Sequence, residues 1–385
     1  MIREEMLIRK KVMLRAMQKD KAIPHEQIEV VNEELEETNR ELDIIYSTPK
    51  TLAQHSKDLI DIIGLGTSSN KPSEPVFLIP SKINYKKRDL TKVIRSGVDA
   101  IDKRIIGFNP GELSIWSGSN GSGKSSILSQ IAIECVDKNF RCAIFSGELE
   151  ACRVLDWMAL QAAGKRHTEG TQYENYYRVP DDIKEKIDKW LDGKFFIYNN
   201  DYGTKVENVL RAIKECIDKQ GINMVIIDNM MSLDLAGASG EKYEKQTSLV
   251  LALCALAKQS NVHIHFVAHP RKSIGFLRKT DISGTADITN AADNVFIVHR
   301  VNADFKRTIK QDLGLKDETP LLKFSNVIEI AKNRDLGISD EFIGLYFEKE
   351  SKRFLNSMNG QKRYCWETDG DDYEKSDNEK LPFDD

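Results

Sequence analysis

The sequence predicts an α/β fold built on a mostly parallel central sheet and preceded by a small helical N-terminal region. From Gly107 onward, continuous apolar runs of strand length alternate with helical segments. Such runs are typical of parallel strands that helices cover on both faces. A glycine-rich loop, Gly118–Ser125, joins the first of these strands to a helix and indicates where the fold holds a ligand.

The individual elements follow from the apolar patterns and from the residues that interrupt them. We expect strands over 112–117, 141–146, 194–198, 223–228, 262–268 and 294–298. We expect helices over 126–135, 150–163, 206–220 and 244–260. Residues 324–332 and 342–347 are predicted to form a terminal hairpin.

The loop Gly118-Ser-Asn-Gly-Ser-Gly-Lys124-Ser125 fits the G-x-x-x-x-G-K-[ST] pattern at every fixed position. Its glycines let successive N–H groups turn inward as an anion nest, and the helix that follows adds its N-terminal dipole. Lys124 is predicted to reach the β- and γ-phosphates, and Ser125 is predicted to ligate Mg²⁺. The candidate nucleotide-binding residues are Gly118, Ser119, Asn120, Gly121, Ser122, Gly123, Lys124, Ser125 and Ser126. The sequence therefore predicts a site for ATP, or another nucleoside triphosphate, with Mg²⁺.

Three strands are predicted to end in side chains that complete this site. Asp228 ends one apolar run, where a carboxylate lies beside Ser125 and holds Mg²⁺. Glu148 follows another strand and is placed to deprotonate the attacking water, with Glu150 as its competitor. His269 ends a third strand, where it senses the γ-phosphate or serves as a structural histidine.

Two groups of cations follow apolar strands without an obvious local reason. A long loop after His269 carries the first group and is placed to touch a second ligand; its cations are Arg271, Lys272, Arg278 and Lys279. The second group is Lys332-Asn-Arg334. It is either an arginine finger supplied to a neighbouring active site or a plain surface pair.

Composition and charge limit the class of protein. Of the 385 residues, 30% are charged and 40% are hydrophobic, which is ordinary for a globular protein. The net charge of −4 argues at first against a nucleic-acid partner, but the last twenty residues hold nine acidic side chains and two lysines. These residues contribute −7, so residues 1–365 carry +3 and leave room for a locally built DNA channel.

The six cysteines show no CxxC spacing and no pairing with histidine, which argues against a structural zinc site and predicts reduced thiols. No apolar run approaches the ~18–20 residues that cross a bilayer, and the first residues lack a signal-peptide pattern. We therefore expect a cytoplasmic protein with no membrane contact.

We divide the chain into a helical N-terminal region (1–63), a linker (64–94), an ATPase domain (95–360) and an acidic, disordered tail (366–385). The N-terminal region is predicted to be helical over 1–23 and 25–46, with a short helix over 52–63. It forms either a small cap or an arm that packs on a neighbouring subunit. The tail is expected to dock on a basic pocket of a partner, with a merely solubilising role as the alternative.

A series of short motifs extends from about Arg95 to Phe354 in a definite order. The series comprises Gly118–Ser125, Ser146–Glu148 with Arg153, Val225–Asn229, Gln246, His269–Lys272, Ala292–Val295 and Lys332–Arg334. In these residues the chain resembles the Twinkle-like and phage replicative DNA helicases of the DnaB-like family, which have a RecA-like P-loop ATPase core and belong to superfamily 4. The resemblance covers the helicase domain only.

The resemblance implies an ATP-dependent replicative DNA helicase. Such a motor forms a hexameric ring, translocates 5′→3′ on single-stranded DNA and unwinds duplex. Glu148 would be its catalytic base, His269 its γ-phosphate sensor, and Arg334 with Lys332 would act in trans on the nucleotide of the adjacent subunit. Arg300 and Phe347 fall where family members stack on the nucleobase. Arg271 and Lys272, extended by Arg278 and Lys279, would be DNA-binding residues that track the phosphate backbone.

Three departures from the family pattern accompany the resemblance, and the first is that residues 269–287 do not match the family's loop cleanly. Asn290 stands where relatives usually carry Gln, and no primase or zinc-finger domain is expected ahead of the core, because residues 1–75 are too few. A polymerase, a primase or another replisome partner would then be recruited through the acidic tail. Two other functions remain open: a RecA-like recombinase that forms filaments, and a replisome loader or adaptor that uses ATP only to switch conformation.

Overall fold

The structure, a computed structural model, describes residues 25–47, 59–61, 79–82, 89–235, 242–271, 275–282, 286–358 and 360–367, with single positions between 10 and 18. Its centre is a nine-stranded sheet in the order β11-β10-β9-β8-β1-β7-β6-β2-β5. The strands are β1 (Leu113–Ser117), β2 (Cys142–Ser146), β5 (Phe195–Ile197), β6 (Met224–Asp228), β7 (His263–Val267), β8 (Asn294–Arg300), β9 (Asn326–Asn333), β10 (Glu341–Phe347) and β11 (Phe354–Leu355). The six strands from β8 to β5 are parallel, and β9, β10 and β11 continue the sheet in antiparallel fashion.

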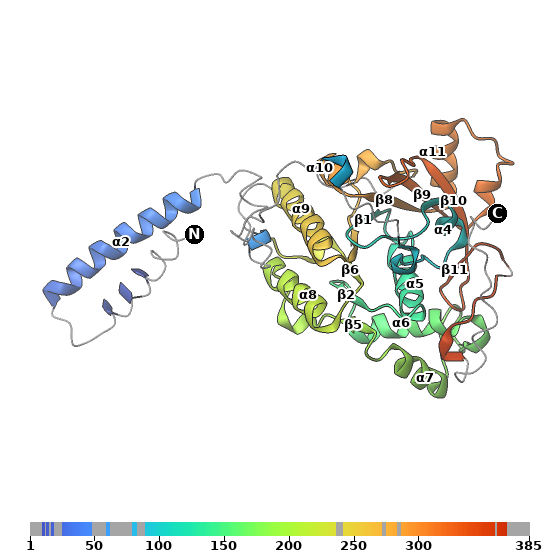
Figure 1. Ribbon diagram of the computed structural model, residues 1–385, viewed down its shortest axis with the longest axis horizontal. Helices are drawn as coiled ribbons and strands as arrows, with labels where there is room; N and C mark the ends of the chain where they lie inside the picture. Colours follow the sequence, from blue (N-terminus) through green and yellow to red (C-terminus); the bar gives the residue numbers. More distant parts are fainter. Residues whose placement is uncertain are drawn as a thin grey trace.

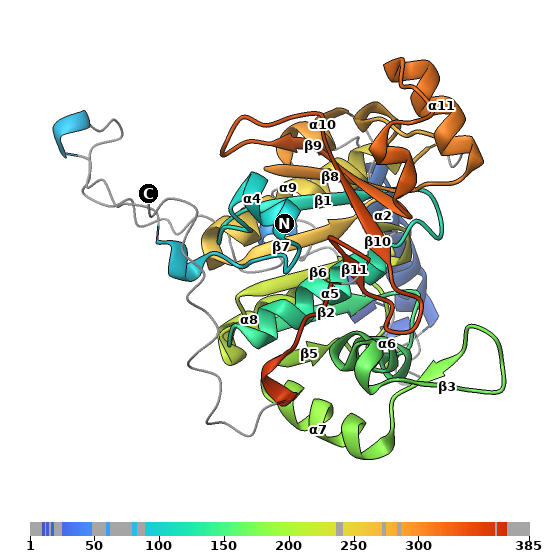
Figure 2. The same ribbon diagram turned by 90° about the vertical axis from the view of Figure 1, so that its right-hand side faces the viewer.

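Helices cover both faces of the sheet, as Figures 1 and 2 show. The helices are α2 (His25–Ser47), α4 (Asp99–Ile105), α5 (Lys124–Asp137), α6 (Ala151–Ala163), α7 (Asp181–Leu191), α8 (Val206–Gln220), α9 (Lys242–Ser260), α10 (Ala286–Ala291) and α11 (Ala303–Leu313). One core lies under α8 and α9, and a second lies under α4, α5, α6 and α7. A small two-stranded hairpin, β3 (Glu169–Gly170) with β4 (Tyr177–Arg178), stands outside the sheet.

The apolar runs form central strands because their side chains supply both cores in alternation. In β6, Val225 and Ile227 belong to the core under α8, whereas Met224 and Ile226 belong to the core under α5. A strand with one polar face could not fill both layers. The predicted fold class, α/β with a mostly parallel sheet, is therefore confirmed.

The predicted strands and helices of the core are all present, with bounds within a few residues of those expected. The terminal hairpin is confirmed as β9 and β10, which pair antiparallel. Sequence analysis did not identify four helices of the core, α4, α7, α10 and α11. The last of them, α11, matters below, because it contacts the predicted DNA-binding loop.

The packed core extends past the predicted domain limits at both ends. Val93 and Ile94, which we placed in the linker, are buried, and Ile94 pairs with Phe108 through two backbone hydrogen bonds. At the other end, Tyr364 is buried and the Trp366 indole donates to the Ala162 oxygen. The physical reason is apolar contact, which composition-based boundaries overlook.

The terminal regions are described only in part. The predicted helix over 25–46 is present as α2, whereas most of 1–23, of 52–63 and of the linker lies outside the described residues, as do residues 368–385 of the acidic tail. Leu59, within the predicted third helix, is buried against the core under α8 and α9. Among the helices that the structure describes, none has the length and apolar character to cross a membrane.

Candidate functional site

The glycine-rich loop lies at the carboxyl end of β1 and leads directly into α5. Gly118 has φ 147° and Gly123 has φ 100°, in the region that favours glycine. A Cβ atom at Gly118 would lie 2.3 Å from the Val298 carbonyl oxygen, and one at Gly123 would lie 2.6 Å from Cζ of Phe354. Both positions therefore need glycine, because the loop packs tightly against β8 and β11.

The side chain of the loop lysine folds back onto the backbone of the loop. Lys124 Nζ donates to the carbonyl oxygens of Gly118 (2.9 Å) and Ser119 (3.0 Å). Burial lowers the pKa of the Lys124 ammonium, and the carboxylates of Asp228 and Glu148 oppose that shift. A buried cation held by neutral carbonyl groups fits a phosphate, which offers it stronger, charged acceptors.

Ser122 links the loop to the antiparallel part of the sheet. Its carbonyl oxygen accepts a hydrogen bond of 2.8 Å from Asn326 Nδ2 in β9. Its Oγ is buried and has no hydrogen-bond partner within the described part of the chain. An unpartnered buried hydroxyl beside the anion nest is a second feature that fits a phosphate. Sequence reasoning missed Asn326, since no local pattern distinguishes it.

Asp228 at the end of β6 lies against Ser125 in the first turn of α5. Burial raises the pKa of the Asp228 carboxyl, the hydrogen bond with Ser125 lowers it, and the nearby Glu148 raises it again. A carboxylate and a hydroxyl are oxygen donors of the kind that Mg²⁺ prefers. The described residues hold no group of three or more His, Cys, Asp or Glu suited to a metal. Phosphate oxygens and water would therefore supply the remaining ligands.

Glu148 meets side chains from two other strand ends. Asn229 Nδ2, just after β6, donates to Glu148 Oε1, and His269 Nε2, just after β7, lies 3.6 Å from the same oxygen. The Glu148 side chain is 61% exposed, so water can reach it. Its competitor Glu150 instead precedes α6 and accepts a hydrogen bond from Cys152. This geometry favours Glu148 as the base and adds Asn229, to which sequence analysis gave no role.

Lys332 and Arg334 lie at the opposite edge of the sheet from the loop. Because β9 runs antiparallel to β8, its residue Asn333 pairs with Asn294 at the start of β8. Asp293, the preceding residue, accepts a hydrogen bond from the N–H of Leu113, where β1 begins. The phosphate loop follows the other end of β1. Neither cation therefore lies in the nucleotide site of its own chain.

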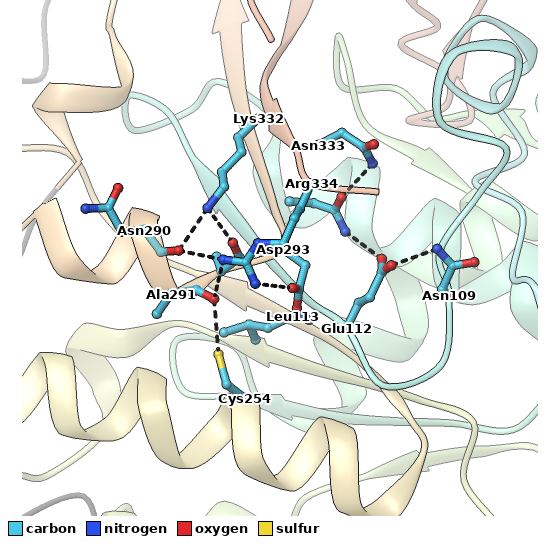
Figure 3. A network of polar contacts seen from close by, with 12 residues as sticks. Asn109, Glu112, Leu113, Cys254, Asn290, Ala291, Asp293, Lys332, Asn333 and Arg334 are labelled. Carbon is cyan, nitrogen blue, oxygen red and sulfur yellow. Dashed lines mark hydrogen bonds and ion pairs between the residues drawn. The ribbon is translucent and has the colours of Figure 1, made fainter. Parts of the chain in front are cut away.

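Both cations are held in place at that edge, as Figure 3 shows. Arg334 Nη1 forms an ion pair of 2.7 Å with Asp293, and its Nη2 donates to the Asn290 carbonyl oxygen at 2.7 Å. Lys332 Nζ donates to three carbonyl oxygens at the end of α10, those of Thr289, Asn290 and Ala292. Burial is the main cause that lowers the pKa of Lys332, and the positive charge of the neighbouring Arg334 lowers it further. The Arg334 side chain remains 47% exposed and is available to another molecule.

The two residues predicted to stack on the base lie on the loop side of the sheet. Arg300 is the exposed last residue of β8 and pairs with Asn326. Phe347 ends β10 and packs on the Phe354 ring at 5.2 Å between centroids. Phe354, which sequence analysis missed, is clamped by Gln130 of α5: the amide donates to the Phe354 oxygen and accepts from its N–H.

Three of the four predicted DNA-binding residues lie in the loop that follows β7. Arg271, Arg278 and Lys279 are exposed there, whereas Lys272 lies outside the described residues. The loop is closed where Pro270 pairs with Ile282 and where the Arg271 N–H donates to the Asp281 oxygen at 2.7 Å. Since β7 is a neighbour of β1, this basic loop lies at the same sheet edge as the phosphate loop.

Comparison with known protein families identifies the family of this chain. Residues 93–356 match the family described as DnaB-like helicase C terminal domain. The chain belongs to this family. The matched range begins at Val93, one of the two buried residues that precede the predicted N-terminal limit, and it ends before the buried Tyr364.

Curated relatives agree with that assignment at low identity. The chain is 25% identical over 199 residues to the Twinkle homolog protein, chloroplastic/mitochondrial, of Arabidopsis thaliana, covering 50% of this chain and 28% of that protein. It is 24% identical over 219 residues to the replicative DNA helicase DnaB of Helicobacter pylori strain ATCC 700392 / 26695, covering 54% of this chain and 43% of that one. The chain thus spans less than half the length of these relatives.

Solved structures agree in fold. A DnaB-like replicative helicase, reported with its interactions with primase, aligns with a TM-score of 0.54 at 14% identity, over 92% of this chain and 77% of its own. An isolated ATPase domain aligns with a TM-score of 0.53 at 15% identity, over 69% of this chain and 91% of its own. The RecA-like architecture expected from the sequence is confirmed.

Proposed function

We propose that this chain is the motor of an ATP-dependent replicative DNA helicase, which assembles as a hexameric ring and translocates on single-stranded DNA. The single observation that carries the proposal is the division of the catalytic groups between two edges of one sheet. Lys124, Asp228 and Glu148 share one edge with the exposed basic loop, and Arg334 lies at the other edge. Each site is complete only where the Arg334 side of one subunit meets the phosphate-loop side of the next.

At the nucleotide site, this chain's own residues bind and position. The loop N–H groups and Lys124 hold the phosphates, and Ser125 and Asp228 would hold the cation. When bound, Mg²⁺ would neutralise charge that develops on the phosphoryl oxygens. Glu148 takes the proton of the attacking water, and Asn229 fixes the orientation of the carboxylate while it does so. His269, which faces the same oxygen, links the state of the site to the basic loop.

Arg334 would act in trans on the nucleotide of the adjacent subunit, with Lys332 beside it. Its ion pair with Asp293 and its hydrogen bond to the Asn290 carbonyl oxygen fix the position of the guanidinium before a neighbouring subunit binds. An arginine supplied in this way is worth about 10³–10⁵ in rate in known phosphoryl-transfer enzymes. Asn290 contributes through its backbone here, so the shorter side chain at this position leaves that contact intact.

We propose further details that rest on family analogy and on the residues named above. The nucleotide is ATP, its base stacks between Arg300 and Phe347, and movement is 5′→3′ in the cytoplasm. The acidic tail, most of which lies outside the described residues, would dock on a polymerase, a primase or another replisome protein.

A fork-unwinding assay tests the proposed function directly. Substrates with only a 5′ tail or only a 3′ tail are compared in the presence of ATP and Mg²⁺. We expect unwinding of the 5′-tailed substrate and little of the other. DNA-stimulated hydrolysis with no unwinding of either fork, together with open filaments in electron micrographs, would instead indicate a strand-exchange protein.

A further inference from the structure

The basic loop after β7 is tied to α11. Phe276 is buried in a small cluster with Phe305 and Ile309 of α11, together with Leu322 and Val327. Its ring packs edge-on to Phe305 at 5.9 Å between centroids. This cluster is separate from the two main cores of the sheet. The loop therefore has its own apolar anchor.

A polar contact fixes the same point. The N–H of Phe276 donates to Thr308 Oγ1 at 2.7 Å, and that hydroxyl donates onward to the Asp304 carbonyl oxygen at 2.8 Å. Gly275 has φ +83°, and a Cβ atom there would lie 2.9 Å from the Thr308 side chain. Backbone and hydroxyl are thus in close contact, and the Thr308 side chain determines the position of residues 275 and 276.

The anchor lies next to the cations that face solvent. The Arg278 guanidinium stacks over the Phe276 ring at 5.1 Å, and Lys279 is the next residue in the chain. The loop is also closed at its base, where Pro270 pairs with Ile282. Pro270 directly follows His269 in the chain. The described part of the loop is consequently held at two points, one next to the nucleotide site and one on α11.

We propose that Phe276 and Thr308 are positioning residues for single-stranded DNA, which hold Arg278 and Lys279 toward the phosphate backbone. This inference rests on the proposed function and deepens it. With Phe276 held on α11, a shift of His269 would change the orientation of the loop and so move Arg278 and Lys279. Without that contact, the loop would absorb the shift, and ordering the two cations on DNA would cost more conformational entropy.

The test uses Thr308→Val, which keeps the volume of the side chain and removes the acceptor for the Phe276 N–H. A buried N–H left without a partner shifts an equilibrium by about 5- to 150-fold. We expect half-maximal stimulation of ATP hydrolysis to need about tenfold more oligo-dT, with basal hydrolysis and the maximal stimulated rate within about twofold of wild type. Thr308→Ser, which keeps the hydroxyl, should restore the wild-type value. Gln311→Ala, on the exposed side of the same helix, is the matched control.

The salt dependence of oligo-dT binding separates positioning from a general defect in folding. If Arg278 and Lys279 no longer meet the backbone, the slope of log K against log salt falls by about 0.7 for each lost phosphate contact. A partly misfolded protein would lose binding amplitude and keep the slope. A Thr308→Val slope and half-saturation equal to wild type would overturn the anchor while leaving the helicase intact. Failure of the wild type itself to bind oligo-dT would overturn the proposed function, and the anchor with it.

Discussion

Glu148, the proposed base, is contacted by side chains from two other strand ends. It lies at the end of β2, and it receives Asn229 from the end of β6 and His269 from the end of β7. The three strands are neighbours in the sheet, so their carboxyl ends meet. The chain thereby places an amide donor and an imidazole on the same carboxylate oxygen without any sequence proximity among the three.

The first prediction concerns this base. Glu148→Gln keeps the shape of the side chain and removes the basic oxygen, so kcat for ATP hydrolysis should fall by about 10²- to 10⁴-fold. Nucleotide affinity, measured with a fluorescent ATP analogue, should change little because Lys124 and the loop are untouched. Glu150→Gln is the matched control and should keep wild-type turnover. Equal losses in the two variants would show that Glu148 is not the base.

Sequence analysis located the residues that sit at strand ends and missed those that depend on distant contacts. Lys124, Asp228 and Glu148 are predictable because loop and strand ends occupy fixed places in a parallel sheet. Sequence analysis did not identify Asn326 or Phe354, because Asn326 bonds Ser122 of the loop across 204 residues and Phe354 bonds Gln130 of α5 across 224 residues. No pattern in a single sequence records such long-range contacts.

At the scale of elements, β7 carries two buried histidines into the sheet. The rings of His263 and His265 lie 4.6 Å apart between centroids. His263 Nδ1 bonds the Asn109 carbonyl oxygen at 2.7 Å and its Nε2 bonds Ser114 Oγ at 2.8 Å, which fits a neutral imidazole that donates from Nδ1. Burial lowers the pKa of His263 from 6.5 to about 4, and it lowers that of His265 well below its ordinary value.

The second prediction is an acid-sensitive fold. The depressed pKa of His263 means that the unfolded chain takes up a proton below pH 6.5 while the folded chain stays neutral until about pH 4. Its contribution to stability is therefore complete above pH 6.5 and is lost as the pH falls toward 4. Between pH 7 and pH 5 we expect this group to remove about 2 kcal/mol of unfolding free energy.

Urea unfolding at both pH values checks the second prediction. His263→Gln should be less stable than wild type at pH 7 and should lose less stability on going to pH 5. Identical losses in the two proteins would show that other groups set the acid response.

The helices that sequence analysis missed have a common physical cause. In α11 only Phe305 and Ile309 are fully buried, one turn apart, and the other side chains are mostly charged or polar. In α7 the buried residues are Ile187 and Leu191, again one turn apart. These segments are mostly polar and contain few apolar residues, whereas α5, with thirteen buried positions, is largely apolar and directly follows the glycine-rich loop.

At the scale of the whole molecule, the residues proposed to act lie at the two opposite ends of the parallel strands. The phosphate loop and the basic loop lie at the carboxyl edge of the parallel strands, and Lys332 with Arg334 lies at the other edge. The prediction of a terminal hairpin was sufficient to place β9 and β10 together. It did not show that the antiparallel direction of β9 carries Arg334 away from the nucleotide site of its own chain.

The third prediction concerns the acidic tail. Glu367 accepts a hydrogen bond from the Tyr364 N–H and lies 3.3 Å from His167, so the deletion should begin at residue 368. Removing residues 368–385 should leave DNA-stimulated hydrolysis and unwinding within about twofold of wild type, because none of the named catalytic groups is touched. Binding of a replisome partner, measured by biolayer interferometry, should weaken. Unchanged binding to polymerase and primase alike would leave the tail as a solubilising segment.

The central claim is that each ATP site is built from two subunits, and mixed rings test it most directly. Glu148→Gln and Arg334→Ala should each be nearly inactive alone, having lost the base or the finger at every site. In rings assembled from equal amounts of both, about one quarter of the interfaces pair an intact loop side with an intact Arg334. We predict that DNA-stimulated ATP hydrolysis recovers toward about a quarter of the wild-type rate. No recovery in rings that native mass spectrometry shows to contain both variants would contradict the shared site.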